Sequence, residues 1–199
     1  LKEHLDAQVL INTTPRGMFS RESGMAMDPG LFPDLEGAID VVYNPLRTEF
    51  VQKARSMGVP AAGGLYMLVR QAVLASEIFL DTQYPEELTE RVYRSIKASK
   101  ENIVLTGMPG SGKTTVGEAL EQLTGREAID LDREIVRRAG RSIPEIFASD
   151  GEASFRELER QVTAEIGAMS GKLILTGGGV VKDPRNYAPL HQNGRIYHI

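Results

Sequence analysis

Residues 107–114 constrain the fold of this chain more than any other segment. They read Gly-Met-Pro-Gly-Ser-Gly-Lys-Thr and lie between an apolar run, Asn102–Thr106, and a helical pattern, Thr115–Leu123. A glycine-rich loop that ends in Lys-Thr between a strand and a helix is typical of a phosphate-binding loop. The glycines let backbone N–H groups turn toward phosphate oxygens, and the following helix points its positive end at the same anion. A glycine-rich turn with an exposed lysine is the alternative.

Different residues of this loop are suited to bind the phosphates of a nucleotide and its Mg²⁺ ion. Lys113 is placed to reach the β- and γ-phosphates, and the hydroxyl of Thr114 is placed to ligate Mg²⁺. The motif alone indicates a nucleotide-binding protein. The residues that we expect to bind the nucleotide are Gly107, Gly110, Ser111, Gly112, Lys113, Thr114 and Thr115.

The composition argues against several other classes of protein. The 199 residues suffice for one large or two small domains, and a net charge of -4 gives no electrostatic case for binding nucleic acid or an anionic membrane. The chain has no cysteine, which excludes disulfides and fits a reducing cytosol. The start, Leu1–His4, is charged, and the apolar stretch Gly64–Leu80 is interrupted by polar residues. We therefore expect a cytoplasmic protein without a signal peptide or membrane span.

Two different patterns meet near residue 100, and both contain strands and helices. We divide the chain into a first domain at 1–84, a helical linker at 85–100 and a second domain at 101–199. A loop rich in Gly, Pro and Ser, Thr14–Glu36, separates the first two expected strands. Expected strands in the first part are Gln8–Asn12 and Ala38–Tyr43, and expected helices are Thr48–Met57, Gly64–Leu80 and Pro85–Ala98.

Strands alternate with helices in the second part, which indicates an α/β fold with a parallel sheet and helices on both faces, as in P-loop NTPases. The expected strands are Asn102–Thr106, Glu127–Leu131, Lys172–Thr176 and Arg195–Ile199. The expected helices are Lys113–Leu123, Arg133–Ala139, Ser142–Phe147, Glu152–Ala168 and a short one near Pro184–Leu190. Because strands lie close to both ends, we interpret the chain as a fragment that is cut inside domains.

A pair of carboxylates, Asp130 and Asp132, follows the second strand of this part. Strand alternation places both on one face, at the carboxyl edge where ligands bind in such sheets. Beside a phosphate loop, one carboxylate can hold hydrated Mg²⁺ while the other accepts a hydroxyl proton. The alternative is that Asp132 caps the helix that begins at Arg133.

Two further motifs favour a small carboxylate-bearing acceptor. Arg156 and Glu159 are spaced i,i+3 on a helix, so Glu159 can orient a guanidinium that binds a carboxylate. An ordinary solvated ion pair is the alternative. The glycines 177–179 follow an apolar strand and permit close backbone approach to a ligand, or form a flexible turn.

Together these motifs resemble shikimate kinase over Glu101–Ile199. The resemblance implies ATP-dependent phosphorylation of the shikimate 3-hydroxyl, with Asp130 binding Mg²⁺ through water and Asp132 contacting shikimate as the base. It implies that Arg156 binds the shikimate carboxylate and that Lys113, Asp132 and Arg156 are the catalytic residues. The remaining substrate contacts that it implies are Phe147, Phe155, Gly177, Gly178 and Gly179.

The chain also departs from the pattern of that family. The lid with its arginine, a second carboxylate-binding arginine and the adenine-binding segment are expected to follow residue 199. Thr176 and Gly177 stand where many phosphate-loop enzymes have a metal-binding Asp, so Asp130 must carry the metal role.

The first part resembles the carboxyl-terminal part of shikimate dehydrogenase, through the segments Asn12–Met18, Asp40–Thr48 and Gly63–Gln71. The resemblance implies the end of a Rossmann-type NADP domain. It places Asn12–Met18, Val41 and Gly64 near the nicotinamide, and Tyr43 and Gln71 at shikimate. From its position on a mostly apolar helix, Gln71 could equally be a buried structural amide. The family's catalytic Lys and Asp and its glycine-rich fingerprint belong to earlier segments, so we expect no dehydrogenase activity from this fragment.

Both resemblances point to the same small molecule. We therefore interpret the chain as part of a bifunctional dehydrogenase–kinase of chorismate biosynthesis. Its cofactors would be ATP, Mg²⁺ and NADP, and its substrates shikimate and 3-dehydroshikimate. The alternatives are another phosphate-loop kinase of small metabolites, such as a gluconate kinase, and a catalytically silent nucleotide-binding module. The sequence leaves the oligomeric state open.

Overall fold

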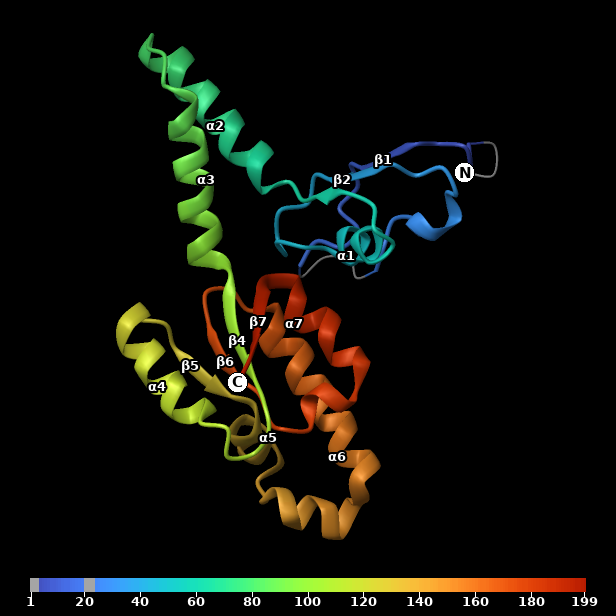
Figure 1. Cartoon of the computed structure of the whole chain (residues 1–199), viewed down its shortest axis with the longest axis vertical. Helices are drawn as coiled ribbons and strands as arrows, with labels where there is room; N and C mark the ends of the chain where they lie inside the picture. Colours follow the sequence, from blue (N-terminus) through green and yellow to red (C-terminus); the bar gives the residue numbers. More distant parts are fainter. Residues whose placement is uncertain (1–3, 20–23) are drawn as a thin grey trace. The chain divides into compact units, whose positions relative to one another are not determined.

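Two parallel sheets organise the residues that the computed structural model describes, 4–19 and 24–199 (Figure 1). Parts of the charged start and of the expected loop, residues 1–3 and 20–23, lie outside these ranges. The chain divides into two units, Leu1–Lys100 and Glu101–Ile199. The expected α/β class with parallel sheets is confirmed. Among the described residues, no helix is long and apolar enough to cross a membrane.

The sheet of the first unit has the order β1-β2-β3 with every pair parallel. Its strands are β1 (Val9–Asn12), β2 (Gly37–Asp40) and β3 (Ala61–Ala62). β2 ends three residues earlier than the sequence predicts. The reason is local, because the Asp40 carboxylate accepts a hydrogen bond from the N–H of Val42 at 3.0 Å and turns the chain out of the sheet. The sequence did not predict β3, which has only two residues.

Three helices and a short 3-10 turn complete this unit: η1 (Pro29–Leu31), α1 (Glu49–Ser56), α2 (Leu65–Leu80) and α3 (Glu86–Lys100). Thr48 caps α1 by accepting from the N–H of Val51 at 3.3 Å, which fixes the helix start. α1 buries Phe50, Val51 and Ala54 in a core with Leu10 and other residues of the sheet side.

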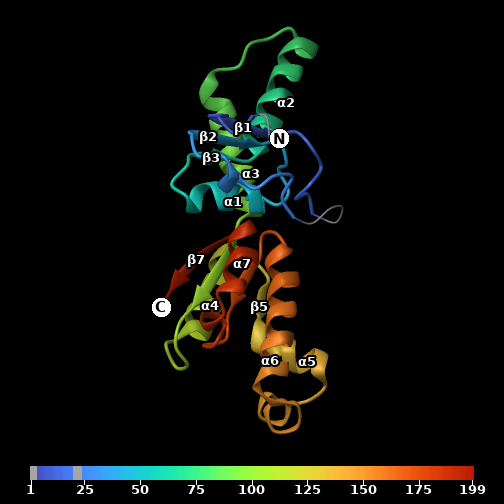
Figure 2. The same ribbon diagram turned by 90° about the vertical axis from the view of Figure 1, so that its right-hand side faces the viewer.

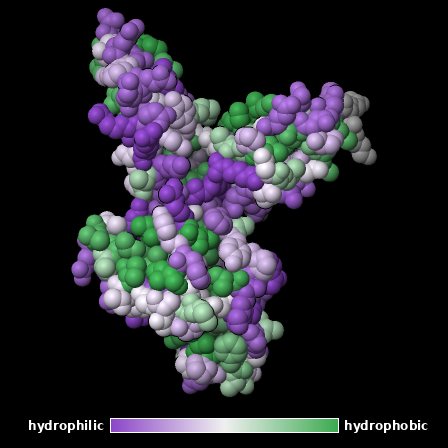
Figure 3. Space-filling model, viewed as in Figure 1, coloured by the Kyte–Doolittle hydropathy of each residue, from purple (hydrophilic) through white to green (hydrophobic). Residues whose placement is uncertain are grey.

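α2 and α3 run side by side as a helical hairpin (Figures 1 and 2). The unit boundary after Lys100 coincides with the end of the segment that the sequence assigns to a linker, and α3 packs on α2 within the first unit. The far end of α2 exposes apolar side chains, with Ile78 at 80% and Phe79 at 85% exposure. Hydrophobic surface is visible at this end of the hairpin in Figure 3.

The second unit contains a parallel sheet of order β5-β6-β4-β7. Its strands are β4 (Asn102–Thr106), β5 (Ala128–Asp130), β6 (Leu173–Leu175) and β7 (Gly194–His198). In register, Leu175 of β6 lies opposite both Leu105 of β4 and Asp130 of β5. The carboxyl ends of three neighbouring strands therefore meet at one edge, and the segments that follow them emerge there.

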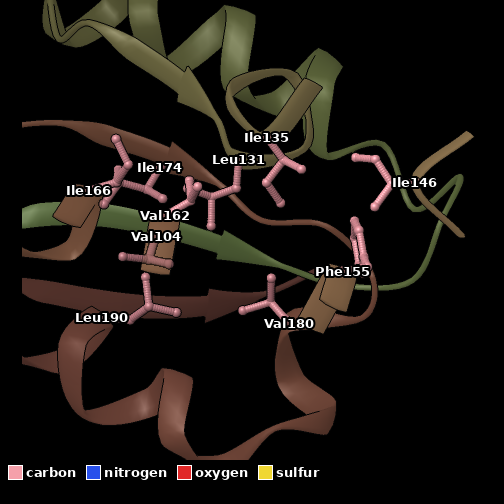
Figure 4. Close-up of a cluster of buried hydrophobic side chains, with 10 residues drawn as sticks. All are labelled: Val104, Leu131, Ile135, Ile146, Phe155, Val162, Ile166, Ile174, Val180 and Leu190. Atoms are coloured by element: carbon pink, nitrogen blue, oxygen red, sulfur yellow. The ribbon is translucent and has the colours of Figure 1, made fainter. Parts of the chain in front are cut away.

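Helices cover both faces of this sheet: α4 (Lys113–Thr124), α5 (Leu131–Ala139), α6 (Ile143–Ala168) and α7 (Tyr187–Asn193), with 3-10 turns η2 (Val180–Lys182) and η3 (Pro184–Asn186). α4 lies on the face opposite α6 and α7 (Figures 1 and 2). Strand alternation explains both cores. Val104 packs into a cluster with residues of α5, α6 and α7 (Figure 4), whereas its neighbour Leu105 packs toward α4.

Two sequence-based boundaries in this unit need correction. β5 ends at Asp130 and α5 begins at Leu131, two residues before the expected start at Arg133. The two helices expected at Ser142–Phe147 and Glu152–Ala168 are nearly continuous and meet at Gly151, whose φ of 81° breaks the helical path. Ser142 and Glu145 form a reciprocal capping box at the start.

Candidate functional site

The phosphate loop connects β4 to α4 in a conformation that its glycines allow. Gly110 and Gly112 have φ angles of 81° and 90°, which side chains with a Cβ rarely adopt. Gly112 is also the N-cap of α4 and supplies no side-chain acceptor, so the N–H groups of the first turn remain directed toward the loop. This is the arrangement that binds anions at helix N-termini.

Lys113 folds back across this loop. Its Nζ donates to the carbonyl oxygens of Gly107 and Met108 at 2.9 and 2.7 Å, and to Ser111 Oγ at 3.4 Å. The positive charge is thus held over the turn itself. Because an ammonium group has three N–H donors, an anion that enters the loop must take over at least one of these contacts.

The two carboxylates lie at the sheet edge but on different elements. Asp130 caps α5, with Oδ1 accepting from the N–H of Arg133 at 3.1 Å. Asp132 lies inside the first turn of α5, so the capping alternative for Asp132 is wrong, and strand alternation does not place it. Its carboxylate instead contacts Gly177, where an added Cβ would collide with Oδ1.

The electrostatic surroundings of Asp132 bring four predicted site residues together. Burial raises the pKa of Asp132, and the nearby charge of Asp130 raises it further, whereas Lys113 and Arg156 lower it. Asp130, Lys113 and Arg156 therefore each lie within electrostatic reach of the Asp132 carboxylate. A carboxylate with a raised pKa is the stronger proton acceptor.

Arg156 is held by two carboxylates of its own helix. Its Nη1 donates to Glu159 Oε2 at 2.8 Å, and its Nη2 donates to Glu152 Oε1 at 3.2 Å. Glu159 is 1% exposed, and burial raises its pKa while Arg156 lowers it. The solvated-pair alternative is therefore wrong for Glu159, whose burial makes it a fixed anchor for the guanidinium.

Phe147 and Phe155 stack with ring centroids 4.7 Å apart and an interplanar angle of 30°. They come from opposite sides of the break at Gly151, and this break makes their contact possible. Phe155 is 4% exposed and belongs to the core, while Phe147 is 36% exposed. The Arg156 guanidinium lies 5.1 Å from the Phe155 ring centroid, so an apolar wall adjoins the cation.

The glycines 177–179 each contact a different part of the site. Gly177 lies against the Asp132 carboxylate, and an added Cβ on Gly178 would be 2.7 Å from Cδ of Pro109 in the phosphate loop. On Gly179 an added Cβ would be 3.1 Å from Cζ of Arg156. The segment is a packed turn, in which the N–H of Val180 donates to the carbonyl of Gly177 at 3.2 Å. Sequence reasoning missed Pro109, since only the fold places it beside Gly178.

Residues that could hold Mg²⁺ share one hollow of about 510 Å³, which Thr114 and Asp130 both line. Within residues 4–19 and 24–199, no group of three or more His, Asp or Glu side chains could cage a metal. Mg²⁺ fits such a site, since it commonly takes one or two carboxylates and completes its shell with water and substrate phosphates.

A buried polar network joins the carboxyl ends of β1 and β2 in the first unit. Asp40 accepts from Asn12 Nδ2 at 3.0 Å and from Thr48 Oγ1 at 2.6 Å, and it is 0% exposed. Thr14 in turn donates to Asn12 Oδ1 at 2.7 Å. The network fixes the two loops that the sequence predicts to lie near a ligand, although the sequence did not assign it that role.

The predicted site residues of the first unit lie in two places. Gly64 packs on the carbonyl of Val41 with no room for a Cβ, and its N–H donates to the carbonyl of Val42 at 2.9 Å. Tyr43 follows on the same loop and is 38% exposed. Gln71 is exposed and lines an apolar hollow between α2 and α3, so the buried-amide alternative is wrong.

Comparisons with known proteins match most of the second unit to one family. The family described as shikimate kinase matches residues 109–199. A shikimate kinase of Nitrosomonas europaea is 47% identical over 98 residues, which cover 49% of this chain and 46% of that protein. The chain spans about half the length of the curated relatives that it matches. Residues 109–199 thus form a shikimate kinase-like domain.

Two solved structures are similar to parts of this chain. Shikimate kinase from Acinetobacter baumannii in complex with shikimate is 39% identical, covers 52% of this chain and 58% of that chain, and has a TM-score of 0.49. A chorismate mutase/shikimate 5-dehydrogenase fusion protein from Clostridium acetobutylicum is 35% identical and covers 48% of this chain and 36% of that chain, with a TM-score of 0.45.

Proposed function

We propose that the second unit is the catalytic part of a shikimate kinase, which transfers the terminal phosphoryl group of ATP to the 3-hydroxyl of shikimate. One observation carries the proposal. The segment 177–179 contacts the Asp132 carboxylate, the phosphate loop at Pro109 and the Arg156 guanidinium at the same time. A phosphate donor and a carboxylate-bearing acceptor bound to these groups would therefore meet at one turn of backbone.

Arg156 and Asp132 would bind and activate the acceptor. The guanidinium, fixed by Glu159, binds the shikimate carboxylate through paired N–H donors. Asp132 accepts the proton of the attacking hydroxyl, a task for which its raised pKa suits it. Phe147 and Phe155 line the acceptor pocket, and the backbone of 177–179 completes it.

The phosphate loop and the sheet edge would hold the donor. Loop N–H groups and Lys113 bind the phosphates, while the Thr114 hydroxyl and Asp130, through water, hold Mg²⁺. Asp130 Oδ1 already caps α5, which leaves Oδ2 for a metal-bound water. When bound, Mg²⁺ supplies charge neutralisation on the transferring phosphoryl group.

The test is shikimate-dependent ADP release by the intact gene product that contains this chain, with gluconate as the competing acceptor. We expect release with shikimate alone, and we expect Asp132→Asn to reduce it by about 10²-fold or more, in the range typical of a lost general base. Release that is faster with gluconate would favour the gluconate kinase alternative. ATP binding by calorimetry without any phosphoshikimate would favour a silent nucleotide-binding module.

We also propose that residues 1–84 belong to an NADP-dependent shikimate dehydrogenase domain, so that the product of one site is the substrate of the other. The contact of Gly64 with the backbone of Val41 supports this, since it brings together two residues that the resemblance assigns to the nicotinamide. Val41 and Gly64 would contact the nicotinamide, and Tyr43 and Gln71 would contact the substrate. The measurement is NADPH fluorescence on titration with the intact gene product that contains this chain. Binding that Gly64→Ala abolishes supports the proposal, and the absence of binding contradicts it.

A further inference from the structure

We propose a phosphate-binding pocket in the first unit, separate from the phosphate loop and independent of the function proposed above. A hollow of about 110 Å³ lies where the loop after β2, the end of α1, the start of α2 and the second half of α3 meet. Its polar lining consists of Arg47, Arg55, Tyr66, Tyr93 and Lys97. No Asp or Glu lines it among the residues that the structure describes.

Arg55 is fixed in this pocket by its own hydrogen bonds. Its Nε and Nη2 both donate to the carbonyl oxygen of Ala61, at 3.0 and 2.7 Å. A guanidinium has five N–H donors, so three remain for a ligand. The cation is thus oriented in advance, which reduces the entropic cost of binding an anion.

Lys97 and two tyrosines, Tyr66 and Tyr93, also line the pocket. The rings of Tyr66 and Tyr93 meet edge to face at 5.4 Å and 77°, and Lys97 Nζ lies 5.7 Å from the Tyr93 ring centroid. Lys97 and both hydroxyls make no hydrogen bond or ion pair within the described part of the chain. Their donors are therefore available, and aromatic contacts restrict where they lie.

The hydrogen-bond donors of the pocket and its volume indicate which ligand it binds. Arg55 and Lys97 make no ion pair among the described residues, and a bound anion offsets the repulsion between two such cations. A volume of about 110 Å³ holds only a few waters of roughly 30 Å³ each, well below the roughly 300 Å³ of common small-molecule sites. A phosphate group fits this volume. It carries close to two negative charges and three or more acceptor oxygens, which match donors from three elements better than a carboxylate does.

The test is an NMR titration of the ¹⁵N-labelled chain with inorganic phosphate at constant ionic strength. Phosphate also binds phosphate loops, so the signals must be resolved by residue. We expect saturable shifts at Gly63, Tyr66 and Lys97 with a midpoint different from that of Gly110 and Gly112. Shifts confined to the phosphate loop, or shifts at the pocket that never saturate, would overturn the proposal.

Matched variants then locate the site. Lys97→Gln should raise the Kd at the pocket by about tenfold, as expected for one lost charge-assisted hydrogen bond. Lys53→Gln removes the same charge from α1 outside the pocket and should leave the Kd unchanged; equal weakening by both variants refutes a defined site. Glycerol 3-phosphate, if it binds more tightly than inorganic phosphate, identifies a phosphomonoester as the ligand, while equal affinity identifies free phosphate. Acetate binding as tightly as phosphate would also refute the assignment.

Discussion

The substitution Gly178→Ala tests whether the segment 177–179 positions the phosphate loop. The added Cβ would lie 2.7 Å from Cδ and 3.0 Å from Cγ of Pro109, and 3.3 Å from the backbone nitrogen of the same residue. Ordinary carbon contacts are about 3.5–4.0 Å, so one segment must move by roughly 1 Å. Gly178 has no positive φ, which leaves the steric contact as the main cost.

Pro109 cannot relieve this contact by rotating a side chain, because its ring is part of the backbone. Overpacking of this kind costs about 1–3 kcal/mol. If the phosphate loop moves, the Kd for ADP rises by roughly tenfold, since each 1.4 kcal/mol is one factor of ten. If the glycine segment moves instead, Asp132 and Arg156 lose their contacts with Gly177 and Gly179, and shikimate binding weakens by a similar factor.

The assay is calorimetric titration of the variant with ADP and separately with shikimate, together with urea unfolding. Gly37→Ala in β2 is the control, because an added Cβ there meets only Val9 at 4.0 Å. We expect the control to leave both ligands unaffected. If Gly178→Ala leaves both Kd values within about twofold of the parent chain and its unfolding free energy unchanged, the coupling argument fails.

Three further outcomes follow from burial and charge. Glu159→Gln should weaken shikimate binding while ADP binding stays unchanged, because it removes the buried charge that orients the Arg156 guanidinium and leaves only Glu152; equal weakening of both ligands contradicts this. Kinase activity should rise with pH as Asp132 loses its proton, at a pH above the usual pKa of 3.8. The same raised pKa stabilises the folded state at low pH, and this stabilisation is lost as the pH rises through the pKa of the folded state. A pH-independent kcat/KM contradicts this. Arg137 and Arg138 lower the pKa of Glu134 to about 2, so its stabilisation is present above the unfolded value of 4.5 and is lost as pH falls toward 2. Because Arg137 is exposed, we expect Glu134→Gln to cost only about 0.5 kcal/mol in urea unfolding at pH 7.

Elements with strong local signals could be predicted from the sequence. The phosphate loop followed from its glycines and flanking pattern. Two expected helices begin at Thr48 and Ser142, and the structure shows that these residues cap α1 and α6. The exposure of Gln71 could not be predicted from the sequence, because the periodicity of α2 does not reveal that one side of this helix faces a hollow between α2 and α3. β3 was not predicted because a strand of two residues is too short to show an alternating hydrophobic pattern.

The contacts that define the candidate site depend on pairings between segments far apart in the chain. Asp132 was located by assuming that a strand continued through it, whereas Asp130 ends the strand by capping α5. The sequence held that signal, since an Asp followed by a helical pattern is an N-cap, but the pair of Asp residues offered two positions for it. Only the tertiary structure decides between them.

Which Asp caps α5 matters for the chemistry, because it gives the two carboxylates different surroundings. One oxygen of Asp130 caps the helix, and Asp130 lines the hollow that it shares with Thr114, where we propose that hydrated Mg²⁺ binds. Asp132, which lies on the helix, contacts Gly177 and is half-buried, and this partial burial raises its pKa. The register of Asp130 opposite Leu175 sets this contact, because it brings the start of α5 beside the segment that follows β6. A slip of one residue in that pairing would move Asp132 away from Gly177 and leave it exposed. The short pairing of β5 with β6 therefore positions the candidate base as much as the residues that touch it.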